Sequence, residues 1–144
     1  MNASDLEPVE FAALTRTDFV RYAGASGDFN PLHHDAEFAR EAGLPDVMGH
    51  GMLSAGLLAT ALTRWFGHGA IRAYAVRFQT PVWPGDRLVA HGTITGDTRD
   101  HADCTVADVE LVLSRASGDI VITGTARVLR AGGQDRSEDE GERT

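Results

Sequence analysis

The segment from Gly51 to Phe66 constrains the fold of this chain more than any other part. It reads GMLSAGLLATALTRWF, so apolar side chains occupy most of its helical circumference. A helix that is apolar nearly all round is a buried helix, and Gly67 directly after it is a favourable end. Four strand-like segments follow it, at residues 73–78, 87–95, 102–113 and 119–129. The sequence therefore predicts an α+β fold in which an antiparallel sheet of about five strands wraps around one long buried helix.

Shorter elements are expected before this helix. Residues 9–14 are apolar enough for an edge strand, and Thr17 is a suitable N-cap for a helix that continues to about Gly24. A second short helix is expected from about Asp35 to Ala42, because Gly43 and Pro45 follow it.

The length of 144 residues fits one domain with a substantial core. We expect this single domain to cover residues 1–130. Residues 131–144 lack large apolar side chains and are rich in acidic ones, so this segment is predicted to be a disordered acidic tail.

The charge balance excludes several classes of function. A formal net charge of −8 argues against nucleic acid and against an anionic membrane as partners. All 13 basic residues are arginines, and the absence of lysine excludes Schiff-base catalysis and a P-loop lysine. Cys104 is the one cysteine, so it cannot form an internal disulfide; we expect it to pack in the core.

A cytoplasmic location is expected for this chain. No uncharged apolar run reaches the roughly 18 residues that a membrane span needs. Asp5, Glu7 and Glu10 stand where a signal peptide would be basic and then apolar.

The most specific motif is SGDFNPLHHD at residues 26–35, which places a carboxylate at Asp28 and an imidazole at His33. Residues five apart on an ideal helix would point about 140° away from each other. Asn30-Pro31 disfavours helix at this point, and a turn there would fold the two side chains toward one point. We therefore predict a catalytic acid–base pair. Taken singly, Asp28 is equally suited to a turn, and His33 to an ordinary core or surface position.

A second motif, HGML at residues 50–53, opens the buried helix. The backbone N–H of Gly51 would lie at the positive end of the helix dipole and could polarise a carbonyl group. The predicted oxyanion and substrate-binding group is Gly51, His50 and Asn30. Within it, His50 is better suited to orienting or packing than to acting as a second base, and Asn30 to shaping the loop. The alternative for Gly51 is a plain helix-start glycine.

Other kinds of chemistry find less support. His33, His34, Asp35 and His50 are metal-ligand types, but they lack a recognised metal-binding spacing, so no metal is expected. Neither Ser26 nor Ser54 lies in a nucleophile-elbow pattern. Five arginines are candidates for binding coenzyme A phosphates, each with solvated surface as the alternative: Arg40, Arg64, Arg72, Arg77 and Arg87.

These motifs resemble those of the MaoC-like, or R-specific enoyl-CoA hydratase, family of hot-dog proteins. The resemblance spans roughly residues 15–130 and includes Tyr22-Ala23, SGDFNPLHHD, GLPDVMGHGML, Arg77-Phe78 and Pro84-Gly85-Asp86. One departure is Gly49, where such proteins often carry alanine before the His-Gly pair; this difference concerns the shape of the pocket.

The resemblance implies a hydro-lyase that interconverts (R)-3-hydroxyacyl and trans-2-enoyl thioesters, with Asp28 and His33 flanking one water or hydroxyl on the same face of the substrate. It implies no cofactor, since the substrate itself is a thioester of coenzyme A or acyl carrier protein. It also implies a homodimer, or a heterodimer with a related chain, whose pocket lies near the interface. Two alternatives stay open: a non-catalytic acyl-binding partner subunit and a hot-dog thioesterase.

Overall fold

The computed structural model describes residues 4–99 and 104–130. Its elements, in chain order, are β1 (Ser4–Asp5), β2 (Val9–Glu10), α1 (Arg16–Ser26), the 3-10 helix η1 (Pro31–His33), α2 (Ala36–Glu41), α3 (Gly51–Phe66), β3 (Ile71–Phe78), β4 (Leu88–Arg99), β5 (Thr105–Arg115) and β6 (Ile120–Leu129). The tail predicted for residues 131–144 lies outside the described residues.

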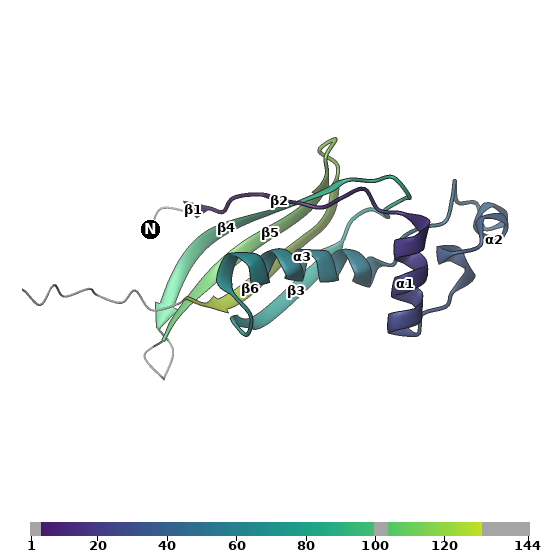
Figure 1. Ribbon diagram of the computed structural model, residues 1–144. Coiled ribbons are helices and arrows are strands. Elements are labelled where there is room, and N and C mark those ends of the chain that lie inside the picture. Colours follow the sequence, from purple (N-terminus) through teal and green to yellow (C-terminus); the bar gives the residue numbers. More distant parts are fainter. Residues whose placement is uncertain (1–3, 100–103, 131–144) are drawn as a thin grey trace, which may run out of the picture.

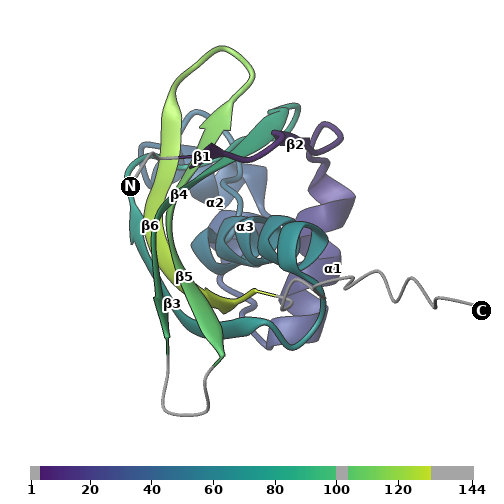
Figure 2. The ribbon, with the colours of Figure 1, turned by 90° about the vertical axis from the view of Figure 1, so that its left-hand side faces the viewer.

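The strands form one antiparallel sheet in the order β1-β4-β5-β6-β3, and β2 also pairs with β4. The sheet curves around α3, which lies along its concave face (Figures 1 and 2). Register shifts between Ile94 and Gly96, and between Leu113 and Ser114, mark irregularities of the kind that bend strands. The described sheet has six strands rather than about five, because two segments of two residues each pair with β4.

Helix α3 has the bounds that its sequence predicted, and its apolar side chains form the centre of the core. Leu58 and Leu62 are fully buried and belong to the same cluster as Leu111 and Ile122 of the sheet. The hydroxyl of Tyr74 in β3 donates to the carbonyl of Ala55 at 2.8 Å. The helix therefore packs against the sheet through apolar contacts and this partly buried hydrogen bond.

The N-terminal elements differ from prediction in detail. Helix α1 is capped by Thr15 rather than Thr17, because Thr15 and Asp18 form a reciprocal capping box. It continues past Gly24 to Ser26, and Gly27 ends it with a φ of 76°. The strand expected over residues 9–14 is shortened to Val9–Glu10.

Three further points bear on function. Cys104 is exposed, so its predicted place in the core is wrong; it precedes the first residue of β5 instead of lying inside the strand. No helix in the described ranges is long and apolar enough to cross a membrane. Helices α1 and α2 lie at the end of α3 that begins with Gly51 (Figure 1), and this end carries the candidate site.

Candidate active site

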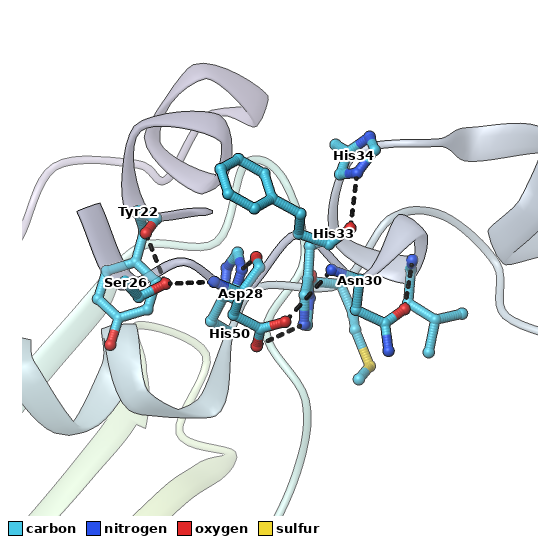
Figure 3. A network of polar contacts seen from close by, with 10 residues as sticks. Tyr22, Ser26, Asp28, Asn30, His33, His34 and His50 are labelled. Atoms are coloured by element: carbon cyan, nitrogen blue, oxygen red, sulfur yellow. Dashed lines mark hydrogen bonds and ion pairs between the residues drawn. The ribbon is translucent and has the colours of Figure 1, made fainter. Parts of the chain in front are cut away.

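The loop between α1 and η1 is folded by its own short polar side chains (Figure 3). The hydroxyl of Ser26 donates to the carbonyl of Tyr22 and accepts from the N–H of Asp28. The carboxylate of Asp28 accepts from the N–H of Asn30, and the side chain of Asn30 accepts from the N–H of Leu32. Asn30 is thus the N-cap of η1, which agrees with the expected loop-shaping role.

This loop brings Asp28 and His33 together, as expected from the predicted turn at Asn30-Pro31. His33 Nε2 lies 3.6 Å from Asp28 Oδ2, and Figure 3 shows the two side chains facing each other. The imidazole is buried, whereas the Asp28 side chain is 53% exposed. His33 Nδ1 lies 2.7 Å from the carbonyl oxygen of Met48. Because a carbonyl only accepts hydrogen bonds, Nδ1 carries a proton, and Nε2 is the nitrogen available to the carboxylate side.

His50 supports both members of the pair. Its ring stacks on His33 with centroids 3.7 Å apart, and it contacts the ring of Tyr22 at 4.9 Å. Its Nε2 donates to the backbone carbonyl of Asp28 at 3.0 Å. This hydrogen bond occupies the donor of a neutral imidazole, so the geometry agrees with an orienting role. His50 Nδ1 is buried and has no hydrogen-bond partner among the described residues.

Ligand atoms of Asp28, His33 and His50 lie within 4.8 Å of one another, a proximity that sequence spacing had not indicated. The ring geometry does not fit a metal centre, however. The two imidazole planes are inclined by only 26° with ring centroids 3.7 Å apart, so their in-plane lone pairs lie in two stacked, nearly parallel planes. They cannot converge on one ion at the roughly 2.0–2.1 Å that zinc–nitrogen bonds need. That no metal is required stays a prediction.

The N-terminus of α3 adjoins this pair, because its N-cap residue is His50. His50 makes no side-chain capping bond, and no described residue accepts from the N–H of Gly51. A Cβ added at Gly51 would lie 3.1 Å from the ring of Phe78, tighter than ordinary contact. The absence of a side chain therefore leaves a free backbone donor at the positive end of the helix dipole.

A cavity of about 240 Å³ opens at the same place, and its walls include Met48, Gly49, Gly51, Ser54, Phe78 and Val82. Gly49 donates its N–H to the carbonyl of Val82 at 2.8 Å. A Cβ at Gly49 would come within 2.5 Å of Val82 Cγ2 and 2.9 Å of Phe19 Cε1. A larger residue at position 49 would therefore force Val82 or Phe19 to shift, which accounts for the departure noted in the sequence.

Arg115 is a residue of the site's surroundings that the sequence had not indicated. It donates to the carboxylate of Asp86 at 2.9 Å and to the carbonyl of Pro81, holding the segment that forms one cavity wall. Among the candidate arginines, Arg64 lies over the ring of Phe11 and Arg72 donates to the carbonyl of Gly69, so both have structural contacts. All five candidate arginines are exposed: Arg40, Arg64, Arg72, Arg77 and Arg87.

Comparison with known proteins identifies the family. The model of the MaoC like domain matches residues 4–115. The chain is 34% identical over 137 residues to an (R)-specific enoyl-CoA hydratase of Rhodospirillum rubrum, covering 87% of this chain and 88% of the relative.

Solved structures share the fold. The (R)-hydratase from A. caviae involved in PHA biosynthesis superimposes with a TM-score of 0.78 and 26% identity, over 90% of this chain and 96% of that one. The ChsH1-ChsH2 complex from Mycobacterium tuberculosis gives a TM-score of 0.76 at 23% identity, over 90% and 97% of the two chains. The chain therefore belongs to the MaoC-like domain family and has the hot-dog fold of its (R)-specific hydratase relatives.

Proposed function

We propose that this protein is a hydro-lyase that interconverts (R)-3-hydroxyacyl thioesters and trans-2-enoyl thioesters. The observation that carries the proposal is the 3.6 Å separation of His33 Nε2 and Asp28 Oδ2 beside a free helix N-terminus. The related (R)-specific enoyl-CoA hydratase of Rhodospirillum rubrum supports this reaction class and its stereochemistry.

Dehydration removes a proton from the α-carbon, and the C–H electrons form the double bond as the 3-hydroxyl group leaves and is protonated to water. Hydration reverses each step. A separation of 3.6 Å exceeds a direct hydrogen bond, yet one oxygen placed beside both groups can contact Asp28 and His33 together. We infer that this oxygen is the substrate water or 3-hydroxyl, and that the pair exchanges its protons. Such acid–base catalysis contributes about 10²- to 10⁴-fold to a rate.

The backbone N–H of Gly51 would donate a hydrogen bond to the thioester oxygen. Charge on this oxygen grows as the α-carbon loses its proton, and a preorganised donor at a helix N-terminus stabilises that charge. The cavity between Gly51 and Val82 would hold the acyl group. The substrate arrives as a thioester of coenzyme A or acyl carrier protein, and the proposed steps need no further cofactor.

The test is hydration of crotonyl-CoA, followed as loss of its conjugated-enoyl absorbance. We expect turnover by the wild-type protein and losses of at least about 100-fold in Asp28→Asn and His33→Ala. His68→Ala is the matched control, because His68 is exposed beyond the far end of α3. Near-wild-type turnover by either site variant would refute the assignment. Release of free thiol instead of hydration would identify a thioesterase.

We also propose that two chains associate through β3. This strand is at one end of the described sheet order and pairs only with β6. An unpaired strand edge readily accepts another strand. Phe78 of β3, which lines the cavity, exposes 51% of its surface, and Met52 of α3 exposes 60%. Sedimentation is expected to give twice the chain mass. A monomer would refute the proposal, and activity only after mixing with a related chain would indicate a heterodimer.

A further inference from the structure

The hydroxyl groups of α3 fall into two kinds. Thr60 donates to the carbonyl of Gly56 at 2.9 Å, and Thr63 donates to that of Thr60 at 2.8 Å. Such bonds to the preceding turn are the usual arrangement for hydroxyls within a helix. Ser54 makes no hydrogen bond from its side chain to any described residue, although it is only 1% exposed. Its hydroxyl is therefore buried without a partner.

This unpaired hydroxyl belongs to the candidate site. Ser54 and Gly51 both line the cavity at the start of α3. Residues three apart are neighbours on one helix face, and helical side chains lean toward the helix N-terminus. The Ser54 side chain thus lies over the turn that begins at Gly51. An O–H donor and a free N–H donor are brought to the same end of the same cavity.

A bound ligand is the natural partner for this hydroxyl. Burial shields Ser54 from water, and the adjacent walls at Phe78 and Val82 are apolar. Rotation about χ1 between staggered positions redirects the hydroxyl, and no hydrogen bond to a described residue holds it in one position. An unpaired buried donor lowers the stability of the free protein. A ligand oxygen in the cavity would remove this penalty.

We propose that the Ser54 hydroxyl donates a second hydrogen bond to the thioester oxygen, beside the N–H of Gly51, as charge develops during the reaction. This proposal rests on the hydratase function above and assigns a further catalytic residue to it. Two donors are needed to satisfy both lone pairs of an oxygen that becomes enolate-like. Ser54 thereby differs from a residue that only shapes the acyl pocket, whose loss would change substrate binding in the ground state.

The test compares kcat and KM for crotonyl-CoA in Ser54→Ala and the wild type. We expect kcat to fall on the order of 100-fold with little change in KM, because the donor acts mainly in the transition state. Ser54→Ala should also unfold at an equal or higher temperature, since it removes an unsatisfied buried group. Ser54→Thr keeps the hydroxyl and should restore part of the lost kcat. Thr60→Val is the control, because it removes a hydroxyl from the same helix outside the cavity walls.

The outcomes separate this proposal from the function on which it rests. An active wild type with an equally active Ser54→Ala variant would overturn the role of Ser54 alone. A rise in KM with unchanged kcat would overturn it too, since this marks a ground-state contact. A wild type without hydratase activity would overturn the proposed function itself. If Ser54→Ala fails to fold, Ser54→Cys takes its place: its weaker S–H donor should give a kcat below wild type, and wild-type kcat would count against the proposal.

Discussion

The two ends of α3 differ in whether their buried polar groups are hydrogen-bonded, although they belong to one helix. From residue 58 to the C-terminal end, Leu58 and Leu62 are fully buried and the hydroxyls of Thr60 and Thr63 are hydrogen-bonded. At the N-terminal end, the N–H of Gly51, Nδ1 of His50 and the hydroxyl of Ser54 lack described partners. Buried polar groups are normally paired. The difference indicates that one end of α3 serves stability, whereas the other keeps polar groups available to a ligand.

The largest expected effect lies in the C-terminal half. Leu62→Ala removes a fully buried side chain and should lower the free energy of unfolding by about 2–5 kcal/mol. Urea unfolding measures this loss. Hydratase activity per folded molecule should stay close to wild type. A folded Leu62→Ala variant without activity would show that the two ends are not separable in this way.

Gly51→Ala is expected to reduce turnover while leaving stability nearly unchanged, the reverse of Leu62→Ala. The new methyl group would lie 3.1 Å from the ring of Phe78, which is 51% exposed and can move. The unfolding free energy should change by less than about 1 kcal/mol, because alanine is a good helix residue. Turnover should fall about 10-fold, since the methyl group blocks close approach to the backbone donor. Unchanged turnover would argue against the N–H of Gly51 as a substrate contact.

Tyr74 lies between the two ends and provides a pH test. Burial raises its pKa from 10.0 to about 12. The unfolded chain therefore loses this proton at lower pH than the folded protein does, so stability should fall as the pH rises from about 10 to 12. Part of this fall should disappear in Tyr74→Phe, measured as the melting temperature across that range. If the melting temperature of the variant fell with pH as that of the wild type does, groups other than Tyr74 would be responsible for the loss of stability at alkaline pH.

The smallest effect on stability is expected at the N-cap of α1. This helix also carries Tyr22, which contacts His50. Thr15→Ala removes half of the capping box and should cost about 1 kcal/mol of unfolding free energy. The hydroxyl and backbone of Thr15 lower the pKa of Asp18. The stabilising effect of this carboxylate is therefore present above its unfolded pKa and lost as the pH falls through the lowered folded value. The stability gap between variant and wild type should narrow in acid; a constant gap would contradict this linkage.

Local patterns predicted much of the fold. The bounds of α3 followed from its apolar circumference and Gly67, and the long strands were located to within a few residues of their observed ends. The cap of α1 was misplaced by two residues because two threonines compete there. Asp18 stands three residues after Thr15, and this capping-box spacing distinguishes Thr15 from Thr17.

The candidate site was only partly predictable for a physical reason. Asp28 lies in the loop before η1 and His33 at the end of η1, so the turn at Asn30-Pro31 was enough to anticipate their proximity. The stacking of His50 on His33 joins segments 17 residues apart in sequence, and the bond from Arg115 to Asp86 spans 29. Contacts between distant segments depend on the assembled fold, and no local spacing encodes them. The unpaired hydroxyl of Ser54 likewise emerges only when its surroundings are known.

The close fit between Gly49 and Val82 has a consequence for how this family can vary. An alanine methyl at position 49 would overlap the Val82 side chain at 2.5 Å, so Gly49→Ala alone is disfavoured here. The exchange becomes accessible once the residue at position 82 is smaller or the Phe19 ring shifts. Positions 49 and 82 are therefore expected to covary among homologous chains, with the order of the two substitutions restricted along any evolutionary path.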